Sequence, residues 1–363
     1  MNIPPLRALV IAVDLHRPGH PLEPELAEFE ALITAVGGVI VDRIVQRRHQ
    51  VDPATLIGSG KAKEIAEQIA AMDSAEAPTT LFVFNDLRPR QRTHLEEIIP
   101  LPIVDRSMLI LDIFSQRARS REGKLQVELA QLRYRQANLI GSSTSLSRLG
   151  GGIGSRGPGE TKLEVDRRRI QARVSLLRRQ LADVQTQRAT RRGDQTRDPL
   201  VALVGYTNVG KSSLLNRFAR TEGAQRAYVA NQPFATLDPT MRRVYLGPEL
   251  QIRLVDTVGF ITELPKELVA AFRATLEELR EANLLLHVLD ISNPDWPRQK
   301  ASVDDILASL DLADTPQLLI ANKADAATTP PPTEAIEVSA LTGDGLDTLR
   351  ERIIQLLEPQ QPS

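Results

Sequence analysis

The chain has 363 residues, of which 42% are hydrophobic and 25% charged, and it contains no cysteine. This length predicts about two or three domains that each bury a core. The absence of cysteine excludes disulfides, thiol catalysis and thiolate metal sites, and the five histidines show no metal-binding spacing. No apolar run approaches the roughly 18 residues of a membrane span, and the first residues show no basic segment followed by an apolar one. We therefore expect a cytoplasmic protein. A monomer is its expected oligomeric state, although no sequence feature decides this.

The net charge of −1 hides a strong asymmetry along the chain. Residues 113–197 contain 19 Lys and Arg against 7 Asp and Glu, a net charge of +12. The remaining residues therefore have a net charge of −13. Positive charge segregated in this way is typical of proteins that bind a polyanion. The sequence therefore predicts a basic module inside an acidic protein, with nucleic acid as its partner.

Short apolar runs alternate with helical patterns over residues 1–112, which predicts an N-terminal parallel α/β subdomain. The predicted strands are 8–13, 39–45, 81–84 and 103–104, and the predicted helices are 25–36, 61–72 and 91–99. Within this region Gly58-Ser59-Gly60-Lys61 resembles half of a phosphate loop. Thr55 takes the place of the first glycine and no strong strand leads into the run, so it favours a helix-starting turn. A weak anion-binding role at this helix N-terminus stays open.

Residues 113–197 predict an antiparallel helical hairpin. One helical pattern runs from about Asp112 to Ile140, and a second carries apolar residues every seven positions from Leu163. Two such stripes close together in sequence favour a coiled-coil-like interface. We expect the paired apolar residues to be Leu125, Leu129, Leu132 and Leu139 on the first helix and Leu163, Ile170, Val174, Leu177, Leu181 and Val184 on the second.

The predicted tip loop between these helices, residues 141–159, contains seven glycines. Loops of this length are mostly binding elements or disordered segments. We interpret the hairpin as a stalk of about 33 Å that carries a basic finger, with a solvated linker as the alternative. Few aromatic residues lie here, which favours contacts with phosphates and RNA shape over base stacking. The expected RNA contacts are Arg148, Gly150, Gly151, Gly152, Arg156, Arg167, Arg168 and Arg169.

Residues 198–363 predict a second α/β domain that binds a nucleotide. An apolar strand at 200–204 runs into a glycine-containing loop, and a helical pattern at 211–218 leaves it. Glycines let successive N–H groups converge on phosphates, Lys211 supplies a positive charge, and the Ser212 hydroxyl can bind Mg²⁺. These flanks argue against a chance glycine-rich turn. The expected phosphate-binding residues are Gly205, Tyr206, Thr207, Asn208, Val209, Gly210, Lys211, Ser212 and Ser213.

Four further segments follow in the order that a GTP-binding domain requires. Asp256 is expected to hold Mg²⁺ through water, and Thr236 to bind the same ion when its loop orders. Asp325, as a buried carboxylate, can accept the N1–H and N2–H of guanine, which adenine does not offer. We therefore expect GTP or GDP with Mg²⁺. The four segments are Phe234-Ala235-Thr236-Leu237-Asp238, Asp256-Thr257-Val258-Gly259, Asn322-Lys323-Ala324-Asp325 and Ser339-Ala340-Leu341.

Two positions concern the chemistry of hydrolysis. Phe260 stands where Ras-type enzymes have a glutamine that orients the attacking water, and a phenyl ring cannot do this by hydrogen bonding. The catalytic group is therefore unknown, and we expect slow hydrolysis by the isolated protein. Asn208 occupies the position at which some GTPases hold K⁺ against the phosphates. Either it holds K⁺ or it only braces the loop.

These segments resemble the HflX family of translation-associated GTPases, which are related to Obg. The resemblance rests on Ile57 to Lys61, on the run from Gly150 to Arg169, and on the nucleotide domain. It implies an α/β protein with an N-terminal parallel α/β subdomain, an antiparallel helical hairpin and a Ras-like P-loop GTPase domain. The additional C-terminal domain of some relatives is expected to be absent or minimal, since the chain ends soon after the nucleotide domain.

The resemblance also implies a partner and an action. The partner is the 50S ribosomal subunit, with the hairpin loop reaching toward the peptidyl transferase region. The action is GTP-dependent splitting of stalled 70S ribosomes under stress. A large-subunit assembly GTPase and a GTP-switched regulatory binding module remain as alternatives.

Overall fold

The computed structural model describes residues 6–16, 21–146, 158–192, 198–219, 234, 240–247, 250–261, 268 and 277–357. The chain forms two compact units, which are described separately. The first comprises residues 1–116 and 125–184, and the second comprises residues 117–124 and 185–363. Among the described residues, no helix has both the length and the apolar character needed to cross a membrane.

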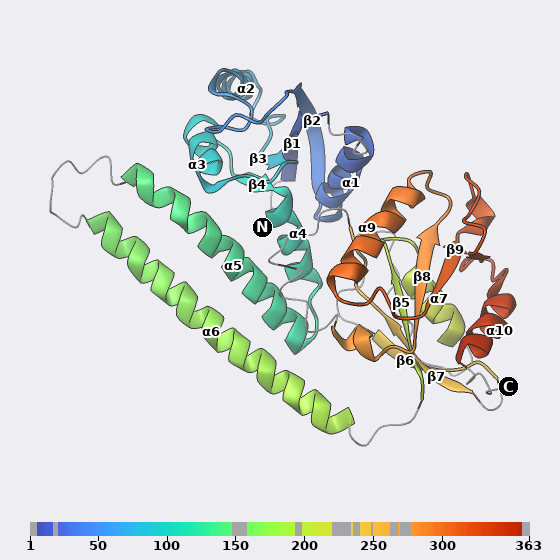
Figure 1. The fold of residues 1–363 in the computed structure, drawn as a ribbon. Coiled ribbons are helices and arrows are strands. Elements are labelled where there is room, and N and C mark those ends of the chain that lie inside the picture. The colour runs from blue at the N-terminus through green and yellow to red at the C-terminus, as the bar shows by residue number, and fades with distance from the viewer. Residues whose placement is uncertain are drawn as a thin grey trace. The chain divides into compact units, whose positions relative to one another are not determined.

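The first unit contains a parallel four-stranded sheet in the order β2-β1-β3-β4 (Figure 1). Leu9, Ile11 and Val13 of β1 pack into a core with side chains of α2 and α3. Figure 1 shows α1 on the other side of the sheet. The predicted parallel sheet with crossover helices is confirmed. Its elements are β1 (Leu6–Asp14), α1 (Leu22–Ala35), β2 (Gly38–Arg47), α2 (Ser59–Ala71), β3 (Thr80–Val83), α3 (Pro89–Ile98), β4 (Ile103–Asp105) and α4 (Arg106–Arg117).

Two features of this unit bear on where a ligand could bind. Helix α2 begins directly after Gly58, which has a φ of 87°, so the predicted helix-starting turn is confirmed. Lys61 there pairs with Glu64 at 2.7 Å. The crevice between the carboxyl ends of β1 and β3 is the usual ligand position in such sheets. Asn85 occupies it, accepting the N–H of Val13 at 2.7 Å and donating to the Val13 carbonyl at 3.1 Å.

The first arm of the hairpin differs from the prediction at both ends. The predicted helix from Asp112 is wrong at its start, because the chain forms α4, breaks at 118–120, and then forms α5 (Arg121–Leu146). Ser120 accounts for the break, since its Oγ accepts the N–H of Gly123 at 2.8 Å and begins a new helix. The predicted loop is too long, because α5 continues past residue 141 to Leu146.

The second arm, α6 (Pro158–Arg192), is also longer than predicted. A proline fits the first turn of a helix, where its missing N–H has no intrahelical partner. The helix continues past Val184, the last apolar residue of the predicted stripe, to Arg192. At 1.5 Å per residue, α5 and α6 are roughly 39 Å and 52 Å long. Arg148, Gly150, Gly151, Gly152 and Arg156 lie outside the described residues.

The two arms meet along the predicted apolar interface, which confirms the hairpin. Arg173 of α6 adds a two-pronged contact with Glu128 of α5, at 2.7 and 2.9 Å. Figure 1 shows the two helices side by side. The buried side chains of the interface are Leu129, Val174 and Leu177, with Leu125, Leu132, Ile170 and Leu181 packed around them.

Tyr134 fastens the first arm to the sheet. Its hydroxyl lies 2.7 Å from both carboxylate oxygens of Asp105, the last residue of β4. Arg92 of α3 donates to the same carboxylate at 2.7 Å, and the N–H of Met108 donates to it at 2.9 Å. Burial and the charge of Asp105 raise the pKa of Tyr134 above its usual value, so the hydroxyl stays protonated and donates.

The second unit contains a six-stranded sheet in the order β10-β9-β8-β5-β7-β6, in which only β6 is antiparallel to its neighbour. Figure 1 shows α9 on one side of this sheet and α7 and α10 on the other. The carboxyl ends of the parallel strands lie at one edge, where ligands of such sheets bind. The strands are β5 (Leu200–Gly205), β6 (Thr240–Tyr245), β7 (Gln251–Asp256), β8 (Leu284–Asp290), β9 (Gln317–Asn322) and β10 (Ile336–Glu337), and the helices are α7 (Lys211–Phe218), α9 (Trp296–Ser309) and α10 (Leu346–Leu357).

Candidate nucleotide-binding site

The candidate phosphate loop connects the buried strand β5 to α7. Two of its residues adopt the left-handed backbone, Asn208 with a φ of 61° and Gly210 with a φ of 96°. A Cβ on Gly210 would lie 2.3 Å from Nδ2 of Asn322, so only glycine fits there. The loop therefore has the tight turn that lets backbone N–H groups converge on phosphates.

Lys211 is buried at the start of α7, where its ammonium group is held by the loop itself. Its Nζ donates to the carbonyl of Gly205 at 3.0 Å and to that of Tyr206 at 2.7 Å. Burial lowers the pKa of Lys211 to about 8, although the charge of Asp256 opposes this shift. A positive charge that has lost its water is strongly attracted to an anionic ligand.

The two residues expected at the Mg²⁺ site lie together. Asp256 ends β7, which pairs with β5, and its side chain is fully buried. The Ser212 hydroxyl donates to Oδ2 of Asp256 at 2.5 Å. A hydroxyl and a carboxylate are oxygen ligands of the kind that Mg²⁺ prefers, so the residues present fit this ion. Of the segment with the third candidate ligand, Phe234 is buried, whereas Ala235, Thr236, Leu237 and Asp238 lie outside the described residues.

The segment after Asp256 packs directly on the phosphate loop. The N–H of Thr207 donates to the Phe260 carbonyl at 2.7 Å, and the N–H of Phe260 donates to the Gly205 carbonyl at 3.1 Å. A Cβ on Gly259 would lie 2.8 Å from the Cα of Thr207, which leaves room only for glycine. The Phe260 side chain is buried and packs in the core.

The two candidate guanine-binding segments meet beside the phosphate loop. The side chain of Asn322 joins them, because Nδ2 donates to the Val209 carbonyl at 2.7 Å and Oδ1 accepts the N–H of Ala340 at 3.0 Å. The Ser339 hydroxyl donates to Asp325 at 2.5 Å. Asp325 itself is exposed on the short helix η3 (Ala324–Ala326), so the prediction of a buried carboxylate is wrong.

Sequence reasoning missed two residues that support these segments. Asp290 accepts a hydrogen bond from Nζ of Lys323 at 2.5 Å and so fixes the residue that follows Asn322. The sequence does indicate a role for Asp290, because this residue ends an apolar strand at the ligand-binding edge of the sheet. Arg217 contacts the carbonyls of Ala340 and Leu341 from α7. No local pattern indicates a contact across 123 residues.

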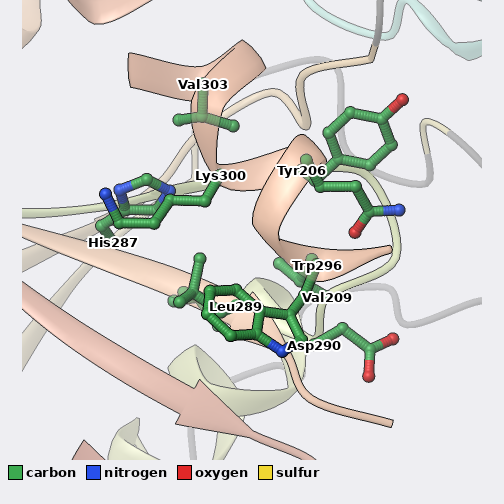
Figure 2. Close-up of a pocket in the computed structure, with 10 residues that line it drawn as sticks. Tyr206, Val209, His287, Leu289, Asp290, Trp296, Lys300 and Val303 are labelled. Carbon is green, nitrogen blue, oxygen red and sulfur yellow. The ribbon is translucent and has the colours of Figure 1, made fainter. Parts of the chain in front are cut away.

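A narrow crevice without room for a ligand lies between β8, α9 and the phosphate loop. Figure 2 shows His287 of β8 beside Lys300 and Val303 of α9. His287 is fully buried, and Nδ1 lies 3.5 Å from Oδ1 of Asp304. Burial lowers its pKa to about 4; the charge of Asp304 opposes this shift, while Lys300 and Lys211 add to it. The imidazole is therefore neutral at pH 7.

A buried neutral histidine makes stability depend on pH. The unfolded chain takes up a proton near pH 6.5, whereas the folded protein does so only near pH 4, so stability is lost as the pH falls through this window. We expect the wild type to lose about 2 kcal/mol more than His287→Leu between pH 7 and pH 5. Thermal unfolding at each pH measures this difference. The exposed His49→Leu is the matched control and is expected to follow the wild type; equal pH profiles for wild type and His287→Leu would contradict the assignment.

Comparison with known proteins covers nearly the whole chain. Residues 23–115 match the family model for the N-terminal region of a GTP-binding GTPase, and residues 117–195 match that for its middle region. Residues 200–323 match the model described as a 50S ribosome-binding GTPase.

Curated relatives and one solved structure agree with these matches. GTPase HflX of Lacrimispora saccharolytica is 44% identical over 93% of this chain and 79% of the relative. GTPase HflX of Escherichia coli is 45% identical over 83% of this chain and 69% of the relative. A structure described as SsGBP in complex with GDP is 23% identical and covers 96% of this chain and 98% of that chain, with a TM-score of 0.51. This last likeness shows the fold.

Proposed function

Since this chain belongs to the HflX family of GTPases, we propose that it acts on the ribosome, binding the 50S subunit and, in its GTP state, splitting stalled or stress-inactivated 70S particles in the cytoplasm. The chain is a GTPase that binds GTP and GDP. Hydrolysis to GDP and phosphate then allows its release. One observation carries the proposal. The same chain contains a basic helical hairpin and a GTPase domain, and the family model that matches this domain is described as ribosome-binding.

The proposed nucleotide contacts follow from the site geometry. Lys211 and the loop N–H groups bind the phosphates, while Asn322, Asp325 and residues 339–341 bind guanine. Ser212 and Asp256, with Thr236, would hold Mg²⁺, which neutralises phosphate charge when it is bound. Asn208 either holds K⁺ or braces the loop, and equal hydrolysis in Na⁺ and K⁺ would exclude the first role. The water-orienting group comes from elsewhere in the chain or from the ribosome.

The hairpin is proposed to contact ribosomal RNA. Arg167, Arg168 and Arg169 are exposed on α6, and Arg168 and Arg169 contact carboxylates of their own helix. Exposed ion pairs are weak, so these arginines can exchange their partners for phosphates. Each phosphate contact releases counterions, which makes RNA binding fall steeply with salt. The remaining proposed contacts are the tip-loop residues Arg148, Gly150, Gly151, Gly152 and Arg156.

Sedimentation of purified 70S ribosomes tests the proposal. With a non-hydrolysable GTP analogue, the protein is expected to convert 70S particles into subunits, whereas with GDP it is not. Deletion of residues 147–157 is expected to abolish splitting and spare GTP binding, because the two activities belong to different parts of the chain. The triple variant Arg167→Glu, Arg168→Glu, Arg169→Glu is expected to weaken binding and flatten its salt dependence, with Arg352→Glu on α10 as the matched control.

The other outcomes of this experiment point to the alternatives. Binding to 50S subunits without splitting would indicate a large-subunit assembly GTPase. Association that does not weaken with salt would indicate an apolar protein contact and a GTP-switched regulatory module. If ribosome and GTP favour the same state, each must raise the affinity for the other by the same factor. Failure to associate in any nucleotide state would overturn the ribosomal proposal.

A further inference from the structure

Arg217, in the last turn of α7, reaches the candidate guanine-binding loop formed by residues 339–341. Its Nε donates to the Ala340 carbonyl at 2.7 Å, and its Nη2 donates to the Leu341 carbonyl. A guanidinium group is planar and presents its donors in a fixed fork, so one side chain fixes two successive carbonyls. The turn at Gly343 also closes on Arg217, since a Cβ there would lie 3.7 Å from Nη1.

Arg217 and Asn322 hold Ala340 from both sides. The N–H of Ala340 donates to Oδ1 of Asn322 at 3.0 Å, and its carbonyl accepts from Arg217. Because peptide groups are planar, these contacts fix the two peptide planes that flank Ala340. Its backbone therefore has little freedom to turn.

These contacts close a ring that includes the phosphate loop. Nδ2 of Asn322 donates to the Val209 carbonyl at 2.7 Å, and Val209 precedes α7, the helix that carries Arg217. The ring thus runs from the phosphate loop through Asn322, Ala340 and Arg217 back to the phosphate loop. The phosphate side and the base side of the site are joined through side chains of the protein.

The tip of this loop has few other anchors. The Leu341 side chain is 75% exposed and so contributes little packing. Ser339 connects the start of the loop to Asp325 at 2.5 Å, and a further contact of its hydroxyl with the N–H of Thr342 shapes the turn. Among the described residues, Arg217 is the side chain that ties residues 340 and 341 to another helix.

We propose that Arg217 is a positioning residue for guanine recognition, which holds residues 339–341 beside Asp325 and thereby slows the release of the nucleotide. This inference rests on the proposed assignment of Asp325 and residues 339–341 to the guanine site. Arg217 acts through the loop carbonyls and not on the phosphates. It therefore governs how long the base stays bound, and not the rate of phosphate transfer.

Release of a fluorescent GDP from the full chain tests this role. Arg217→Ala is expected to raise the dissociation rate and the KM for GTP about tenfold, the loss expected for charged hydrogen bonds. The kcat at saturating GTP is expected to stay unchanged. Competition by inorganic tripolyphosphate, which has no base, is also expected to stay unchanged. Arg217→Lys keeps the positive charge but lacks the planar fork that reaches both carbonyls, so its GDP dissociation rate is expected to lie between those of the wild type and Arg217→Ala. Arg352→Ala on α10 is the matched control.

Three other outcomes would overturn the role of Arg217, and a separate variant tests the guanine-site assignment. Unchanged GDP release in Arg217→Ala would overturn the proposal. So would an equal loss of GDP and tripolyphosphate affinity, or a lower unfolding temperature with no partial rescue by Arg217→Lys, because these indicate a general disturbance of α7. Asp325→Asn tests the underlying assignment separately. If it leaves the preference for GTP over ATP unchanged, the guanine-site assignment fails; if it removes that preference while Arg217→Ala has no effect, only the role of Arg217 fails.

Discussion

Replacing Lys211 with alanine is expected to abolish GTP binding, with a loss of affinity of about 100-fold or more. The ammonium group is buried inside the phosphate loop and is fixed by the carbonyls of Gly205 and Tyr206. Each hydrogen bond between a charged donor and a phosphate is worth about 1.5 to 3 kcal/mol, and about 1.4 kcal/mol corresponds to a factor of ten. Equilibrium titration with a fluorescent GTP analogue measures the loss. Affinity within a factor of three of the wild type would contradict the assigned role.

The same lysine is expected to lower the stability of the nucleotide-free protein. Burial lowers its pKa to about 8, so keeping the charge at pH 7 costs folding free energy. Lys211→Met fills the same space without charge and is expected to raise stability at pH 7 by up to about 3 kcal/mol. The difference should close between pH 8 and pH 10, because the folded wild type loses its proton there first. A Met variant that is less stable than the wild type at pH 7 would mean that the two carbonyl contacts outweigh the cost of burial.

Local chemistry made much of this molecule predictable. The loop from Gly205 to Ser212 lies between strand and helix as expected, because glycine, lysine and serine at fixed spacing require that geometry. The first sheet was predictable from apolar runs separated by helical patterns. The hairpin interface was predictable from the spacing of residues such as Leu129 and Leu177, both of which are buried.

The predictions that were wrong or missing concern features whose local sequence signals are weak and that tertiary structure decides. Gly141 is the first of the seven glycines that predict a loop, yet a single glycine costs a helix only about 1 kcal/mol and α5 continues to Leu146. The break before α5 lies in a polar stretch, residues 115–124, where no apolar spacing marks the end of one helix and the start of the next, although Ser120 is a good N-cap. The exposure of Asp325 depends on what covers η3, which no pattern within Asn322–Asp325 records. The contact between Arg217 and Ala340 spans 123 residues and requires the fold itself.

Replacing Asp105 with alanine is expected to have the largest effect on stability, about 3 to 5 kcal/mol. Asp105 is 1% exposed and accepts hydrogen bonds from Arg92, Tyr134 and Met108. Its removal leaves the largely buried guanidinium of Arg92 with only the half-exposed carboxylate of Glu96, 4.0 Å away, and a poorly compensated buried charge is costly. Urea unfolding monitored by circular dichroism measures the change. A loss below 1 kcal/mol would contradict the role given to this cluster.

Two matched variants separate the charge from the hydroxyl. Tyr134→Phe keeps the ring and removes only the hydroxyl, so it is expected to cost about 1 to 3 kcal/mol. The double variant Arg92→Leu, Asp105→Leu removes both charges and is expected to recover part of the loss seen in Asp105→Ala.

The effect of Asp105→Ala should be confined to the first unit. Trp296, the only tryptophan, lies on α9 of the second unit, so its fluorescence is an internal control and its unfolding midpoint is expected to stay unchanged. GTP affinity is expected to stay within a factor of two, since none of the candidate nucleotide contacts changes. The proposed ribosome splitting is expected to fall in both Asp105→Ala and Tyr134→Phe, because Tyr134 fastens the first arm of the hairpin to the sheet. Splitting at the wild-type rate by a destabilised Asp105→Ala protein would show that the stalk works without this anchor.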